Sequence, residues 1–282
     1  MKIIGVLLPY IVIAGVFYGA VLFLFPAPCS RPISYTIGQV DPQFHVSREQ
    51  FLQSIEKAEH IWEDHTGKQL FSYTPHSDFT INLVYDTRQQ VTDQANALSN
   101  TLSTMSSQQK KTQSQYTQAL AAYTSAKNAY LQDVQDSKKE YSQLEQERLA
   151  VNKLADSVNA LATKEEQIVH TYNANAQQFN QLYAAQREFD QGEYTGKSIT
   201  IYEFSKNNDL QLVLEHELGH ALGLGHVENP ASIMYYMVNQ KNLAATGLSD
   251  EDIFALVSQC KKTSFDVFWE RLQMIPFISR MM

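Results

Sequence analysis

The hydrophobic pattern of the chain begins with an apolar stretch and then changes several times. Residues 3–25 carry no charged side chain. As a helix they would be roughly 35 Å long, and a bilayer core is about 30 Å thick. A cleaved signal peptide has a shorter apolar region and a small-residue cleavage site, whereas Pro26 and Pro28 flank Ala27 here. The pattern favours an uncleaved membrane anchor over residues 1–28. The alternative is a protein secreted after signal cleavage.

Short strand and helix patterns follow the apolar stretch. Residues 33–40 and 79–85 are rich in β-branched and aromatic residues, which predicts two strands. Between them, Ser47 begins a helix, which ends at Gly67. The apolar stripe of this helix has a period of 3.6 residues and comprises Phe51, Ile55, Ala58, Ile61 and Trp62. A strand, a helix and a second strand predict the start of an α/β or α+β domain.

The pattern then becomes a heptad repeat, from about residue 87 to residue 190. This segment is rich in Gln, Ser, Ala, Asn and Thr, and it lacks glycine and proline. Such a long repeat is typical of a coiled coil, whereas a disordered polar linker would lack the regular Tyr and Leu seam. The series includes Ala95, Leu102, Tyr116, Tyr123, Tyr130, Leu144, Val151, Val158, Tyr172 and Phe179, with companions such as Leu98, Met105, Leu161 and Ile168.

Geometry limits how this helical insertion is arranged. If the segments on either side belong to one folded unit, the helix must return to its starting point. Two arms of about 50 residues would form an antiparallel hairpin roughly 75 Å long. The locally polar residues 136–140 are the expected tip. Three shorter helices are the other arrangement that the pattern allows.

The last third of the chain contains the residues with the clearest chemistry. After Gly192, residues 198–204 predict a third strand, and Asn208 or Asp209 caps a helix over residues 210–222. This helix begins the pattern H-E-x-x-H-x-x-G-x-x-H, which runs from His216 to His226.

The spacing of this motif predicts a metal site. Residues four apart share one face of a helix, so His216 and His220 can point at one centre. Gly223 can adopt the left-handed conformation that ends the helix and returns His226 to that centre. Three neutral imidazoles suit Zn²⁺ and leave a fourth position for water, as in catalytic sites. Glu217 is then expected to act as a general base, taking a proton from water and delivering it to a leaving nitrogen.

Composition narrows the remaining possibilities. The net charge of −8 argues against a nucleic-acid partner. Two cysteines are too few for a disulfide scaffold and match no cysteine-based zinc spacing. The other histidines also show no ligand spacing: His45, His60, His65, His76 and His170.

A second motif extends the pattern. The stretch of residues 232–236, Ser-Ile-Met-Tyr-Tyr, resembles the Met-turn of metzincin peptidases, with Met234 beneath the metal ligands. Within that clan the motifs are most similar to the matrixin, or matrix-metalloprotease-like, family. The resemblance covers roughly residues 32–86 and 192–260. It implies an α+β metzincin-type catalytic domain, one catalytic zinc ion and a peptide or protein substrate.

The chain departs from the matrixin pattern in two places. No His/Asp-rich stretch resembles the matrixin loops for structural zinc and calcium, which argues against those ions. Tyr236 stands where matrixins usually have proline. A tyrosine at this place is similar to astacins and serralysins, where it can ligate zinc or stabilise the oxyanion. The alternative role for Tyr236 is a wall of the substrate pocket.

The resemblance also pairs the two ends of the domain. In the matrixin fold the start of the catalytic domain lies near the end of its last helix, which implies a disulfide between Cys29 and Cys260. The alternative is two buried or free thiols. Residues 265–277 are apolar and are expected to pack on the domain, the alternative being a membrane surface.

These interpretations give one predicted organisation: a transmembrane anchor, a catalytic domain split by a coiled-coil insertion, and an apolar tail. The expected function is a membrane-anchored zinc endopeptidase on the extracytoplasmic side, with the substrate paired to the strand near residues 199–204. The alternative is a membrane-tethered coiled-coil adaptor with a vestigial metal site. The insertion is expected to bind a protein partner or another copy. The expected boundaries are 1–28, 29–86, 87–191, 192–262 and 263–282.

Overall fold

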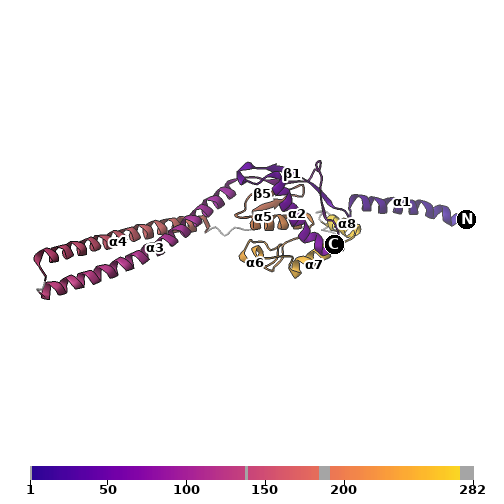
Figure 1. Ribbon diagram of the computed structural model, residues 1–282. Helices are drawn as coiled ribbons and strands as arrows, with labels where there is room; N and C mark the ends of the chain where they lie inside the picture. Colours follow the sequence, from indigo (N-terminus) through magenta and orange to yellow (C-terminus); the bar gives the residue numbers. More distant parts are fainter. Residues whose placement is uncertain (1, 137–138, 184–190, 274–282) are drawn as a thin grey trace. The chain divides into compact units, whose positions relative to one another are not determined.

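The computed structural model describes residues 2–136, 139–183 and 191–273 (Figure 1). The chain forms two compact units, one of Met1–Thr92 with Arg187–Met282 and the other of Asp93–Gln186. We refer to them as the catalytic unit, after the function expected from the sequence, and the hairpin unit, and describe each by itself.

The catalytic unit is built on a five-stranded sheet in the order β2-β1-β3-β5-β4. All neighbouring strands are parallel except β4, which runs antiparallel to β5. The predicted strands are present with shorter ends in two cases, and β2 and β4 are additional. The bounds are β1 Ile33–Val40, β2 Phe71–Tyr73, β3 Thr80–Leu83, β4 Gly192–Tyr194 and β5 Ser198–Ile201.

Two helices cover one face of this sheet. Helix α2 (Arg48–Thr66) begins with the capping box of Ser47 and Gln50 and ends at Gly67, which has a φ of 62°. Helix α5 (Asn207–Ala221) packs beside it, and the Trp62 Nε1 donates a hydrogen bond of 3.0 Å to the Glu215 carbonyl oxygen. The shorter elements of this unit are η1 (Pro42–Phe44), α6 (Gln240–Leu243) and α7 (Asp250–Cys260).

Alternation along the strands separates an apolar face from a polar one. Apolar side chains of the three central strands are buried in a single core with α2 and α5: Tyr35, Ile37, Ile81, Leu83, Ile199 and Ile201. The intervening residues lie on the opposite face, which we call the outer face. They are small or polar: Ser34, Thr36, Gly38, Thr80, Asn82, Ser198 and Thr200.

The hairpin unit consists of the greater part of two long helices, α3 (Thr87–Asp136) and α4 (Tyr141–Tyr183). They lie side by side (Figure 1), and Asn175 Nδ2 lies 3.5 Å from Met105 Sδ. The chain reverses between Asp136 and Tyr141, within the expected tip. A long helical insertion is thus present, as two helices and neither as three shorter helices nor as a disordered linker.

Helices α1 (Lys2–Leu24) and α8 (Ser264–Gln273) come from opposite ends of the chain and contact each other. The rings of Phe17 and Phe268 have centroids 5.8 Å apart, and those of Tyr18 and Phe265 5.5 Å apart. The apolar tail therefore packs on α1 as far as it is described, and its residues 274–282 lie outside the described residues.

Within the described part of the chain, no helix combines the length and the apolar character needed to cross a membrane.

Candidate active site

The active-site helix α5 is held by its buried neighbours. Its side chains Leu214 and Leu218 are fully buried. Gly219 allows a close approach, because a Cβ there would lie 2.3 Å from Met234 Sδ and 2.9 Å from Trp62 Cζ2. Asp209 accepts the backbone N–H groups of Ser205 and Lys206 at the start of the helix, at 3.0 and 3.2 Å. Packing and capping together orient the face that carries His216 and His220.

The chain reverses after this helix at Gly223. Its φ is 86°, and a Cβ at this position would lie 2.4 Å from Gln259 Nε2. The backbone N–H of Leu224 donates to the Gly219 carbonyl at 3.0 Å, which closes the turn. Glycine is therefore favoured by the backbone conformation, and any side chain here would also require the end of Gln259 to move.

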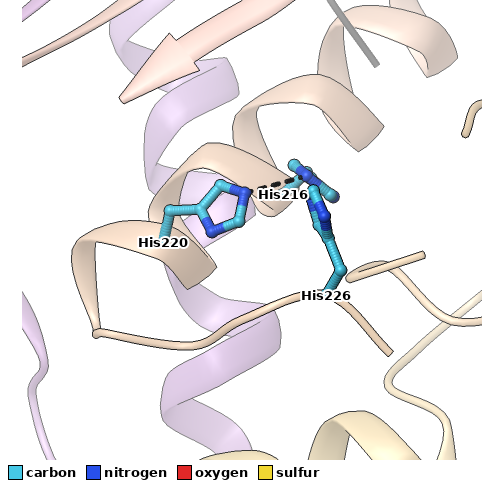
Figure 2. Close-up of side chains that lie close together, drawn as sticks. All are labelled: His216, His220 and His226. Atoms are coloured by element: carbon cyan, nitrogen blue, oxygen red, sulfur yellow. Dashed lines mark hydrogen bonds between the residues drawn. The ribbon is translucent and has the colours of Figure 1, made fainter. Parts of the chain in front are cut away.

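The turn brings the three motif histidines together. One ring nitrogen from each of His216, His220 and His226 lies within 4.8 Å of the others (Figure 2). The Nε2 atoms of His216 and His220 are 3.1 Å apart. His216 is buried, His220 is partly buried and His226 is exposed.

The hydrogen bonds of the histidines fix their tautomers. His216 Nδ1 lies 2.7 Å from the Ile233 carbonyl, and His220 Nδ1 lies 2.9 Å from the Leu224 carbonyl. Because a carbonyl only accepts, both Nδ1 atoms carry the proton and both Nε2 atoms present a lone pair. Two lone pairs at 3.1 Å repel each other unless a cation lies between them, and a hydrogen bond between the rings would need a second proton on one of them. The triad therefore fits zinc, and a carbonyl orients two of its three rings.

Burial keeps these imidazoles neutral. It lowers the pKa of His216 to about 3, against the raising effect of the Ile233 carbonyl. Burial also lowers the pKa of His220. Neutral imidazole is the form that binds a metal ion, so the site is prepared for metal near neutral pH.

Glu217 follows His216 in the sequence and is buried against Gly192 of strand β4. A Cβ at Gly192 would lie 2.8 Å from Glu217 Oε1, so only glycine permits this approach. Burial, together with the charge of Glu193, raises the pKa of Glu217 to about 8.

The predicted Met-turn, residues 232–236, contacts His216 through the Ile233 carbonyl and is held by a residue that sequence reasoning missed. Met234 is fully buried, and the buried Asp252 accepts the backbone N–H groups of Ile233 and Met234 at 3.0 and 3.1 Å. Asp252 also accepts the Ser249 hydroxyl at 2.9 Å. The Ser-x-x-Asp pattern of Ser249 and Asp252 predicts a helix cap, which is present, and gives no sign of a second, distant acceptor role.

Tyr236 lies on the surface of the turn. Its side chain is exposed, and its ring centroid is 4.5 Å from that of Tyr235.

The five histidines outside the motif are not part of the ligand group found among the described residues. Cys29 and Cys260 are joined by a disulfide, with their Cα atoms 5.2 Å apart.

The prediction that the substrate pairs with the strand near residues 199–204 is wrong. Strand β5 has β3 on one side and β4 on the other, so its hydrogen-bonding groups are already used. Strand β4 is the last strand of the sheet, and it lies against Glu217. It was missed because three residues that contain a glycine carry no alternating pattern.

Comparison with known proteins was made for the whole chain. The family model described as Matrixin matches residues 29–259. No curated protein and no solved structure gave a match. Matrixins are metallopeptidases that typically bind zinc, which agrees with the histidine triad. Because the match spans most of the chain and includes both parts of the split domain, this protein belongs to the matrixin family.

Proposed function

We propose that this chain is a zinc-dependent endopeptidase in which Glu217 is the general base. The observation that carries the proposal is the convergence of three imidazole nitrogens beside the buried Glu217 carboxylate. His216, His220 and His226 would hold the ion. When bound, zinc supplies Lewis-acid chemistry that makes water nucleophilic near neutral pH and polarises a carbonyl group.

Glu217 moves the proton. Its carboxylate follows His216 directly in the sequence and lies against Gly192 of β4. It takes a proton from the attacking water and transfers that proton to the leaving amide nitrogen. A carboxyl group with a pKa of about 8 would be mostly protonated at neutral pH. A nearby cation favours the ionised form that a base requires.

The substrate would bind as an added strand along β4. Main-chain hydrogen bonds to an edge strand hold an extended peptide without requiring a particular sequence. Tyr236 has an exposed ring and is proposed to contact the substrate, either at the developing oxyanion or as a pocket wall. Asp252 acts indirectly, by holding the turn that supports the ligands.

The proposal is tested by peptide cleavage with the full chain in detergent, with zinc and with a chelator. Glu217→Gln should lower kcat/KM about 10²–10⁴-fold, because a positioned base contributes roughly that factor. Its zinc content should match the wild type, since Glu217 is not a ligand. Glu193→Gln is not a suitable control because Glu193 lies close to the site; Glu56→Gln, an exposed carboxylate on α2, removes the same charge elsewhere.

One outcome favours the alternative adaptor function. If the zinc-loaded wild type cleaves no peptide, the metal site is vestigial and the hairpin unit is the functional part. Exposed apolar side chains on the hairpin support partner binding: Leu120, Leu131, Val134, Tyr141 and Leu149. If the chain is instead a peptidase, Glu217→Gln should lose cleavage but should cross-link to the same partners as the wild type.

We also propose that residues 3–25 anchor the protein in a membrane, with the catalytic unit on the extracytoplasmic side. The uncharged sequence supports the anchor. The Cys29–Cys260 disulfide supports the orientation, because disulfides persist in oxidising compartments.

A further inference from the structure

The hydrogen-bonding groups of β4 can be assigned to its two sides. Tyr202 N–H donates to the Gln191 carbonyl at 2.8 Å, and Thr195 N–H donates to the Ser198 carbonyl at 3.0 Å. Bonded pairs alternate along an antiparallel ladder. Glu193 and Thr200, which are paired between these two, therefore form the next bonded pair. The main-chain groups of Gly192 and Tyr194 face away from β5, toward the edge of the sheet that no described strand covers.

The side chains of β4 divide in the same regular way. Tyr194 packs with the core, and Gly192 faces Glu217. Glu193 points to the opposite side, the outer face, where it is exposed beside Thr200. An extended peptide that runs antiparallel to β4 and pairs with Gly192 and Tyr194 would have one residue directly opposite Glu193. That position is a non-bonded pair, in which side chains come closest.

The Glu193 carboxylate is held in place on this face. Tyr202 Oη donates to Glu193 Oε2 at 3.1 Å. The Tyr202 ring is in turn covered by the Arg88 guanidinium, whose Cζ lies 3.5 Å from the ring centroid. Arg88 is bound to Asp86 through Nε at 2.9 Å. An acceptor that is already oriented loses less side-chain entropy when it pairs with a cation.

We infer that Glu193 is a specificity-determining residue, which selects a lysine or arginine in the substrate at the position opposite it on the edge of β4. This inference rests on the proposed peptidase function. The selected residue is a neighbour of the one that faces Gly192 and Glu217, so it lies close to the scissile bond. Its side chain lies along the outer face, on the side away from α5.

The test uses the zinc-loaded full chain and peptides that differ at one position. Each position flanking the scissile bond is varied among lysine, norleucine and glutamate, and kcat/KM is measured at low salt. At one position the wild type should prefer lysine to norleucine by roughly two- to five-fold, the range of a cross-strand ion pair. The preference should weaken as salt is added, because the pair is exposed.

Variants then assign the preference to its cause. Glu193→Gln should bring the ratio of lysine to norleucine near one, and Glu193→Lys should turn the preference toward glutamate. Glu56→Gln should keep the wild-type ratio, which separates a local pair from the negative charge of the whole chain. The ratio is taken within each variant, so a change in overall activity does not affect it.

Two results would overturn the inference and are distinct from each other. If peptides are cleaved but Glu193→Gln keeps the lysine preference, or the wild type shows none, Glu193 has no such role and the peptidase proposal stands. If no peptide of the set is cleaved, both proposals fail.

Discussion

Asp252 shows how one buried carboxylate supports a site that it does not touch. It accepts hydrogen bonds from two backbone N–H groups of the Met-turn and from the backbone and hydroxyl of Ser249. Met234, which lies in this turn, packs against Gly219 in α5, the helix that carries His216 and His220. The carboxylate thus connects α7, the turn and α5.

Substitution of Asp252 should therefore be costly. In Asp252→Asn an amide N–H would face a backbone N–H, which leaves a buried donor without an acceptor. We expect a loss of about 2–4 kcal/mol in the free energy of unfolding, measured by denaturant titration. Asp250→Asn, an exposed residue of the same helix, is the control, and an equal loss there would contradict this role for Asp252.

Glu59 is a second buried carboxyl group, in the core behind the active site. Its Oε1 and the Tyr35 hydroxyl are both buried, and neither has a hydrogen bond of regular geometry among the described residues. Burial raises the pKa of Glu59 to about 7, and the Tyr35 side chain acts in the opposite direction. The folded protein therefore holds this proton more tightly than the unfolded chain does.

This pKa gives a defined pH dependence. Below pH 4.5 the group is protonated in both states, and its contribution to stability is fully present. Between pH 4.5 and about 7 only the unfolded chain releases the proton, so the free energy of unfolding decreases as the pH rises. Glu59→Gln should remove this loss, of roughly 3 kcal/mol. Unfolding of both proteins from pH 4 to 8 measures it, and parallel pH curves would exclude it.

At the scale of elements, the two helices of the hairpin unit are held by few buried side chains. Ala95, Val158 and Ile168 are buried and belong to the heptad series, whereas the buried Thr112 does not. Near the tip, Lys139 Nζ lies 2.6 Å from Asp133 Oδ2 and also contacts Glu147. A coiled coil remains the prediction for how these helices pack.

The heptad interpretation predicts which apolar residues stabilise the hairpin. Ile168→Ala should destabilise it by about 2–4 kcal/mol, as in other buried large-to-small changes. Leu149→Ala should have little effect, since Leu149 is 55% exposed. Hydrogen exchange followed by mass spectrometry would localise the loss of protection to α3 and α4. Equal protection in the two variants would contradict a packed seam at Ile168.

At the scale of the whole molecule, the two chain ends are joined beside α1. The disulfide links Cys29, which follows α1, with Cys260, which precedes α8. Aromatic rings of α1 and α8 also contact each other. The insertion begins inside the catalytic unit, because Gln89 bonds both backbone groups of Phe204 and Thr92 donates to Glu203. The first inserted helix begins at Thr87, whereas the compact hairpin unit starts at Asp93.

The proposed anchor makes a prediction at this scale. The full chain should stay with the membrane fraction after extraction at alkaline pH, because residues 3–25 carry no charged side chain into the lipid. Without residues 1–28 the protein should be released. Release of the full chain under the same conditions, with an intact N-terminus by mass spectrometry, would contradict anchoring.

Local patterns in the sequence were enough for the features that depend on nearby residues. The capping box of Ser47 and Gln50, the helical face of His216 and His220, and the left-handed turn at Gly223 each involve residues within a few positions of one another. The reversal near residues 136–140 also followed from the lengths of the two helices. These features follow from backbone geometry, which is the same wherever the segment lies.

Only the tertiary structure decided which distant groups meet. Strand β4 forms the edge beside Glu217 because Gly192 leaves room there, and Asp252 reaches the Met-turn because α7 packs next to it. The outer face that carries Glu193 exists only once the strands are in register. Such contacts depend on packing between segments far apart in the chain, and no periodicity within one segment encodes them.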